Sequence, residues 1–264
     1  MLLYIKSLYA YRGFILGSVK RDFESRYRNS LLGGVWNLLN PLATIVVYMV
    51  IFTNLMQARL PEVNSDFAYG VYIFSGVLAW GLFSEVINRS VGVFVNNANM
   101  LKKLSFPRLC LPVVVVLGSA FNFFLVFLVF LAVLLLLDFS PGIYMIAVVP
   151  LLIIQLLLAA SLGLMLGVIN VFFRDVSHLM VVVLQFWFWF TPIVYPISIL
   201  PEAIKSFVLL NPMTGIVSGY QSIFVYHRWP DMNLLLTPSV LAIVLFVMAA
   251  KVYSARGSEM VDEL

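Results

Sequence analysis

Charged residues are scarce in this sequence: they make up 11% of its 264 residues, whereas hydrophobic residues make up 62% and the mean hydropathy is +1.03. A soluble globular domain carries about twice that share of charge. The composition therefore indicates a polytopic membrane protein, most simply a single transmembrane domain over residues 1–264. The net charge of +4 is weak support for nucleic-acid binding, and we expect no nucleic-acid partner.

Residue types that several kinds of site require are also missing. The one cysteine, Cys110, excludes an intramolecular disulfide framework and a metal site with several cysteine ligands, so we expect no metal. The only histidines, His178 and His227, fall on opposite sides of the membrane in the topology predicted below. A membrane-embedded glycosyl- or phosphotransferase would need clustered acids or a histidine site at one membrane face. We therefore expect no catalytic residues and a protein that is not an enzyme.

The chain contains no G-x-x-x-x-G-K-[ST] phosphate loop, so it cannot bind ATP through that motif. If transport is driven by ATP, another chain must bind the nucleotide. The acids are scattered, apart from Glu85, which precedes Arg89 by four residues inside a predicted span. That spacing favours an intrahelical pair, and we favour a structural pair facing the bundle over a contact with cargo.

What is present begins with a basic N-terminal segment, residues 4–28. Its apolar residues recur at spacings of three and four and form one stripe: Leu8, Tyr11, Ile15, Val19, Phe23 and Tyr27. The segment is too polar to span a membrane, so it predicts an amphipathic helix at the cytoplasmic interface. Two interpretations remain: a plain anchor in membrane lipids, or an anchor that also meets a cytosolic partner.

Six apolar segments have the length of transmembrane helices, and we predict them at 31–56, 69–95, 109–137, 143–173, 178–195 and 234–252, with a bend at Pro150. Lysine and arginine concentrate on one side of this arrangement. Three cations, Arg59, Lys205 and Arg228, are predicted on the external side instead. Both termini are therefore predicted to be cytoplasmic.

Between the fifth and sixth spans, residues 197–229 contain apolar pieces at 201–210 and 213–226 that are too short to cross the bilayer. Pro201 and Pro212 are typical of first helical positions, and Asn211 of a helix cap. We predict a re-entrant helical pair. The predicted fold class is thus an all-α integral membrane protein with six transmembrane helices, an N-terminal amphipathic interface helix and this re-entrant pair.

A polar path through the bundle is predicted from two patterns. Asn37, Asn40, Thr44 and Tyr48 form one polar line on the first span, which could equally serve hydrogen bonding between helices. Residues 185–190, QFWFWF, place Gln185 and Trp189 on one face, whereas Trp187 is predicted to anchor the helix in lipid. Aromatic rings can stack on sugars, but an interfacial aromatic belt uses the same residues. Tyr195 and Tyr220 complete the predicted conduit residues.

Four stretches resemble the permease subunits of ABC transporters that export polysaccharides: RDFESRYRNSLLGGVWNLLNPL at 21–42, NVFFRDVSHL at 170–179, TPIVYPISILPEAI at 191–204 and LLNPMTGIVSGYQ at 209–221. The resemblance implies a homodimeric permease of the bacterial inner membrane, working with two ATP-binding cassette ATPase subunits that hold ATP and Mg²⁺. The cargo it implies is a lipid-linked polysaccharide such as an O-antigen. Capsule or teichoic-acid polymers, or small hydrophobic molecules, are the alternatives.

The cytoplasmic surface available to an ATPase is small. It comprises the N-terminal helix, the loop at 96–108 and the turn near 174, and the resemblance makes the latter two coupling elements. The predicted coupling residues are Arg21, Arg26, Arg28, Lys102, Lys103, Arg108, Arg174 and Asp175. The alternative is that these cations only determine the topology.

Overall fold

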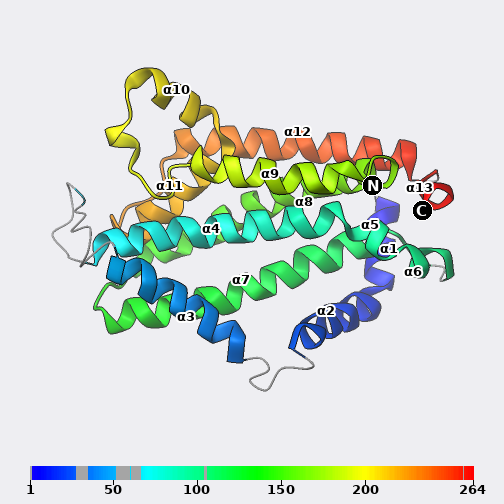
Figure 1. Ribbon diagram of the computed structural model, residues 1–264, viewed down its shortest axis with the longest axis horizontal. Helices are drawn as coiled ribbons and strands as arrows, with labels where there is room; N and C mark the ends of the chain where they lie inside the picture. The colour runs from blue at the N-terminus through cyan, green and yellow to red at the C-terminus, as the bar shows by residue number, and fades with distance from the viewer. Residues whose placement is uncertain (1, 28–34, 52–59, 61–66, 104–105, 258) are drawn as a thin grey trace.

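Helices account for the fold throughout the part of the chain that the structure describes, and no strand occurs there (Figure 1). This computed structural model describes residues 2–27, 35–51, 60, 67–103, 106–257 and 259–264. The predicted all-α class is confirmed. The predicted residues 28, 31–34 and 52–56 lie outside the described part, so the full extent of the first span is not tested.

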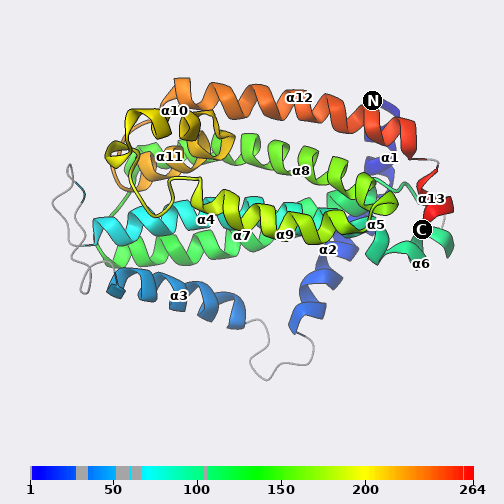
Figure 2. The same cartoon turned by 45° about the horizontal axis from the view of Figure 1, so that its top comes forward.

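Six helices run along the long axis of the molecule, and successive ones run in opposite directions (Figures 1 and 2): α3 (Trp36–Met49), α4 (Ala68–Val91), α7 (Cys110–Leu136), α8 (Val148–Phe172), α9 (Asp175–Trp189) and α12 (Met232–Arg256). Four are long and apolar enough to cross a membrane: α4, α7, α12 and the continuous stretch Gly142–Phe172 that includes α8. The apolar helices in α3 and α9 are shorter. The protein is therefore a multi-pass bundle.

The two ends of the bundle carry different short helices. One end carries α1 (Leu2–Ala10), α2 (Arg12–Tyr27), α5 (Val93–Asn96), α6 (Ala98–Lys103) and α13 (Met260–Glu263). The other end carries η4 (Ile197–Ile199), α10 (Glu202–Leu210) and α11 (Pro212–Phe224) (Figure 1). The first and last helices of the chain thus lie together, away from α10 and α11.

Helix α4 is the centre of the bundle. Within its membrane-length window 78% of the residues are buried, against 33% for α7 and 22% for α12. It packs closely on α8 because Gly163 and Gly167 face Ser90. A Cβ at Gly163 would lie 2.6 Å from the Ser90 Cβ, and one at Gly167 would lie 2.6 Å from the Ser90 backbone oxygen. Small residues four apart allow such an approach between membrane helices.

The predicted single helix over 4–28 is wrong in its continuity, because the chain forms α1 and α2 with a turn at Tyr11. Gly13, a residue of low helix propensity, follows the turn. Part of the predicted stripe packs against protein: Ile15 is buried, and the ring of Phe23 meets that of Phe121 on α7 at 5.3 Å between centroids. The second helix therefore lies against the bundle.

Two predicted helix boundaries are also corrected. The second span stops at Val91, and α5 begins after Gly92. Near the predicted bend at Pro150, a 3-10 helix, η3 (Gly142–Ala147), passes into α8. Pro150 then lies in the first turn of α8, where its missing N–H costs no hydrogen bond. Helix α9 ends at Trp189 rather than at residue 195, because the residue before Pro192 disfavours helical backbone.

The two short helices between α9 and α12 lie where the sequence predicted them. Asn211 caps α11 as predicted, since its side-chain oxygen accepts a hydrogen bond of 3.0 Å from the Met213 N–H, and Pro212 is the first helical residue. Helix α11 is almost wholly buried, whereas Phe207 and Leu210 of α10 are exposed. The pair therefore has one buried and one exposed member.

Candidate functional site

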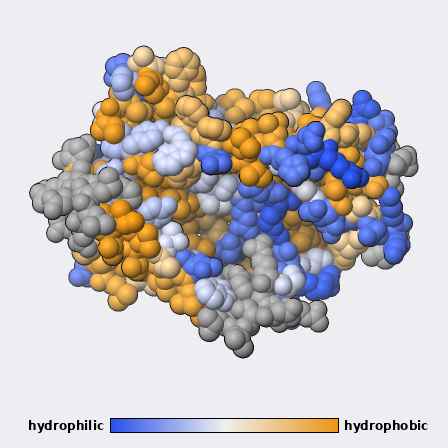
Figure 3. Space-filling model, viewed as in Figure 1, coloured by the Kyte–Doolittle hydropathy of each residue, from blue (hydrophilic) through white to orange (hydrophobic). Residues whose placement is uncertain are grey.

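A line of polar and small residues runs along α4 at spacings of three and four. We call Gly81, Ser84, Glu85 and Asn88 the α4 polar face; Gly81 and Asn88 are exposed, and Ser84 and Glu85 are half-buried. Figure 3 shows hydrophilic residues in the middle of the side of the molecule that carries α3, α4 and α9. Polar groups at membrane depth are costly against lipid. This face must therefore meet protein or a polar path.

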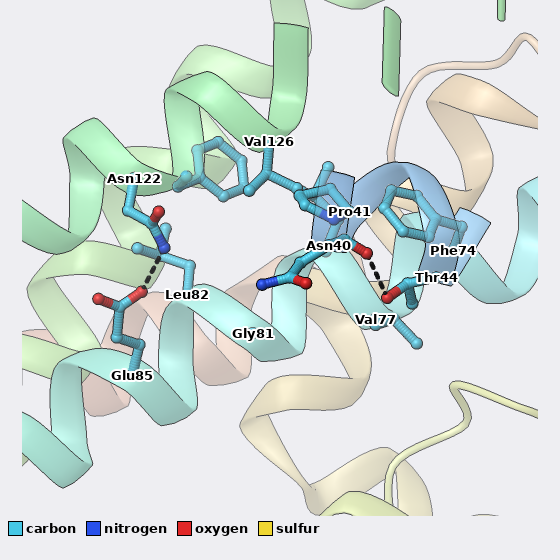
Figure 4. A pocket seen from close by; sticks show the side chains of 12 residues that line it. Asn40, Pro41, Thr44, Phe74, Val77, Gly81, Leu82, Glu85, Asn122 and Val126 are labelled. Carbon is cyan, nitrogen blue, oxygen red and sulfur yellow. Dashed lines mark hydrogen bonds between the residues drawn. The ribbon is translucent and has the colours of Figure 1, made fainter. Parts of the chain in front are cut away.

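On one side of the α4 polar face is a cavity of about 290 Å³ between α3, α4 and α7, lined by Asn40, Pro41, Thr44, Phe74, Val77, Leu78, Gly81, Leu82, Glu85, Asn122, Phe123 and Val126 (Figure 4). The predicted conduit residues Asn40 and Thr44 therefore lie at the same cavity. The Thr44 hydroxyl donates to the Asn40 backbone oxygen at 2.8 Å, so its hydrogen-bond donor is used within α3. The Asn40 and Glu85 side chains also line the cavity, and Glu85 accepts a hydrogen bond from Asn122 there (Figure 4).

On the other side is a cavity of about 310 Å³ between α4 and α9, lined by Trp80, Ser84, Asn88, Val181, Leu184, Gln185, Phe188 and Trp189. Gln185 and Trp189 both line it, which confirms that they share a face. Trp189 is 59% exposed. The two cavities together border the α4 polar face. Three of the lining residues, Trp80, Ser84 and Asn88, were not predicted from the sequence, because single residues of these types are common in an apolar span.

Trp187 is not the lipid anchor that the sequence predicted. Its indole N–H donates to the Asn211 side-chain oxygen at 2.9 Å. Its ring lies edge-on to Phe83, with 5.2 Å between ring centroids, and edge-on to Trp80, with 6.3 Å. The two-residue offset from Trp189 turns Trp187 toward α4 and α11 rather than toward lipid. It is therefore half-buried against the protein core.

The remaining predicted conduit residues lie in different surroundings. Tyr48 is half-buried against the core, and the side chain of Asn37 lies outside the described part. The Tyr195 hydroxyl donates to the Trp189 backbone oxygen at 2.8 Å. Tyr220 is 0% exposed and lines neither cavity.

A network of ionic and polar groups joins three helices next to the first cavity. We call Asp22, Glu85 and Arg89 the ionic network. The Arg89 guanidinium lies 2.6 Å from the Asp22 carboxylate and 3.3 Å from that of Glu85, and it also donates to the Ser119 hydroxyl at 3.2 Å. The Asn122 amide donates to Glu85 at 2.9 Å (Figure 4). The predicted Glu85–Arg89 pair is confirmed, and it faces the bundle.

The helices and turn that carry the described coupling residues lie at the end of the bundle with α1 and α13 (Figure 1). Those with exposed side chains are Arg21, Lys102, Lys103, Arg174 and Asp175. Arg108 is half-buried and donates to the Gly257 backbone oxygen, so it ties the loop at 96–108 to the C-terminal segment. The Arg26 side chain and Arg28 lie outside the described part.

The long apolar helices define a multi-pass membrane protein, and across its described residues no three His, Cys, Asp or Glu side chains lie close enough to hold a metal ion. The chain matches the family described as "ABC-2 type transporter" over residues 15–225, and it belongs to that family. It is a transport permease and not an enzyme.

Relatives that match much or all of the chain are named as export permeases. The chain is 32% identical to "O-antigen export system permease protein RfbA" of Myxococcus xanthus, over 100% of both chains. It is 26% identical to the protein of the same name from Klebsiella pneumoniae, over 78% of this chain and 77% of the relative. It is 23% identical to "Polysialic acid transport protein KpsM" of Escherichia coli, over 75% of each.

Proposed function

We propose that this chain is the membrane-spanning subunit of an ATP-driven exporter that moves a lipid-linked, O-antigen-like polysaccharide out of the cytoplasm across the bacterial inner membrane. The observation that carries the proposal is the α4 polar face, accessible at the middle of a membrane-length bundle and bordered by two cavities. A hydroxyl-rich glycan needs such polar groups along its path. The names of the relatives point to the same class of cargo.

The topology that fits this function has six spans, with α3 and α9 added to the four long helices. Exposed cations on α6 and at Arg174 favour a cytoplasmic position for the end that carries α1 and α13. Helices α10 and α11 then form a re-entrant pair on the external side. A cysteine placed at Ser206 of α10 tests this orientation: a membrane-impermeant thiol reagent should label it in intact spheroplasts, and labelling only after lysis would contradict it.

The path itself is proposed to lie between two copies of the chain. Asn88 of the α4 polar face and Gln185 are exposed on the surface of one subunit, where contact of their amides with lipid would be costly. A second copy would cover them and enclose a path lined by Asn40, Asn88, Gln185 and Trp189. The ATPase partners, two per dimer and each holding ATP and Mg²⁺, would bind at the basic end that carries α1 and α13.

The cargo proposal is tested by replacing the polar groups with an apolar residue of similar size. In cells that lack the native gene, Asn88→Leu combined with Gln185→Leu should lower surface polysaccharide at least about tenfold at equal permease levels, since each lost polar contact is worth about 1 kcal/mol. Lipid-linked polymer should accumulate inside. Leu236→Asn, on the exposed apolar surface of α12, is the control for a polar change elsewhere.

Two outcomes would contradict the cargo proposal. Unchanged surface polysaccharide in the double variant would show that the α4 polar face does not guide the glycan. A deletion strain with normal polysaccharide but impaired efflux of small hydrophobic molecules would favour the alternative cargo class.

A further inference from the structure

Helix α2 is joined to the bundle by a charged contact rather than by apolar packing alone. Asp22 and Arg89 approach to 2.6 Å, with their side chains only 32% and 22% exposed. The same guanidinium also contacts Glu85 on its own helix and Ser119 on α7. Arg89 is thus shared by three helices, of which α2 belongs to the basic end of the molecule.

The contact between α2 and α7 is shaped for this close approach. Next to the ion pair, Phe23 meets Phe121 edge-on, with 5.3 Å between the ring centroids. Gly118 leaves room for the charged groups, because a Cβ there would already lie 3.4 Å from both the Arg89 guanidinium and the Asp22 carboxylate. A larger side chain at this position would occupy the space in which the pair meets.

The ionic network also reaches the wall of a cavity. The second oxygen of Glu85 accepts the Asn122 amide at 2.9 Å, and both residues line the cavity between α3, α4 and α7 (Figure 4). Arg89 bridges the Asp22 carboxylate and the Glu85 carboxylate at that wall. A movement of α2 therefore changes the electrostatic surroundings of a group on the α4 polar face.

We infer that the ionic network is a coupling device: Asp22 and Arg89 make α2 and α4 move together, so that displacement of α2 at the basic end reaches the α4 polar face. The physical reason is that separating α2 from Arg89 removes a partner from a partly desolvated charge, which is costly at membrane depth. The inference rests on the proposed ATP-driven export. Asp22 and Arg89 are positioning residues and need not touch the cargo.

The first measurement follows the docking of α2 and needs no cargo. Cysteines at positions 23 and 121, in a Cys110→Ser background, are cross-linked in membranes with a short bifunctional thiol reagent. Asp22→Arg should lower the cross-linking yield about tenfold, because two cations then face each other. The exchanged pair, Asp22→Arg with Arg89→Asp, should restore it. Lys20→Gln with Glu24→Gln, an exposed pair on the same helix, should leave the yield unchanged.

The second measurement separates coupling from anchoring, in the native sequence with its ATPase partner. Asp22→Arg should lower the polysaccharide exported per ATP hydrolysed about tenfold, while ATP hydrolysis continues, and the exchanged pair should recover most of it.

Retained cross-linking in Asp22→Arg overturns the inference. Lost cross-linking with an unchanged export ratio also overturns it, since the ionic network would then only anchor α2. A wild-type protein that exports no polysaccharide overturns the proposed function instead, and the cross-linking series still decides whether the ionic network docks α2.

Discussion

At the scale of single residues, the Asn211 amide joins the end of α9 to the start of α11. Its oxygen accepts the Trp187 indole N–H at 2.9 Å and the Met213 N–H at 3.0 Å. Its nitrogen donates to the Thr191 hydroxyl at 2.9 Å and to the Phe190 backbone oxygen at 3.3 Å. Every donor and acceptor of this amide is therefore used within one corner, and Trp187 is held there by both its ring and its N–H.

Trp187→Leu should consequently destabilise the protein. The change removes the hydrogen bond to Asn211 and the ring contacts with Trp80 and Phe83. Because Trp187 is half-buried, we expect the free energy of unfolding to fall by about 1–3 kcal/mol, less than for a fully buried aromatic residue. The measurement is the thermal midpoint of the purified protein in detergent. Phe186→Leu, at a residue that is 62% exposed, is the matched control and should change the midpoint little. Equal losses in the two variants would mean that Trp187 contributes no more than any aromatic residue of α9.

At the scale of elements, the contact between α4 and α8 depends on the absence of side chains. Gly163 and Gly167 allow the backbone of α4 near Ser90 to approach α8. Polar side chains then bridge the two helices: Gln155 donates to the Ala79 backbone oxygen at 2.6 Å, and Asn170 donates to that of Val91 at 3.0 Å. These hydrogen bonds need the short interhelical distance that the glycines permit.

Gly167→Ala should therefore be destabilising although alanine favours helix. The new Cβ would meet the Ser90 backbone oxygen at 2.6 Å, and because backbone cannot rotate away, the helices must separate. Overpacking of this kind costs about 1–3 kcal/mol. Urea or thermal unfolding in detergent measures it. Gly13→Ala, where nothing lies within 4 Å, is the control and should be neutral or slightly stabilising; a neutral Gly167→Ala would show that α8 can shift freely.

Elements with a local cause were predictable from the sequence, and contacts between distant residues were not. The long apolar run that became α7 and the Asn211 cap of α11 depend on neighbouring residues, so they were predicted correctly. Asp22 and Arg89 are 67 positions apart, and no periodicity pairs them. The orientation of Trp187 likewise depends on Asn211, which only the folded chain brings near. The shared face of Gln185 and Trp189 was predictable, because one helix face is itself a local pattern.

At the scale of the whole molecule, the chemistry is ordered along the long axis. Exposed cations gather with α1, α6 and α13 at one end, the α4 polar face lies in the middle, and α10 and α11 lie at the other end (Figures 1 and 3). The cations of α6 rest on a packed base, because Leu101 is buried in a cluster that includes Phe94 of α5 and Met260 of α13. This end is thus a packed surface rich in cations, and under the proposed function it is where the ATPase subunits would bind.

Charge reversal at this surface, in a variant that combines Lys102→Glu, Lys103→Glu and Arg174→Glu, should separate docking from folding. All three side chains are exposed, so the variant should insert and remain as stable as the wild type. Repulsion at a charged interface should weaken binding of the ATPase subunit about tenfold or more, and surface polysaccharide should fall with it. Co-purification of the ATPase chain and surface polysaccharide at equal permease levels are the measurements. Lys205→Glu, on α10 at the opposite end, is the control and should leave both unchanged. Wild-type docking and export in the triple variant would show that these cations do not hold the ATPase subunit.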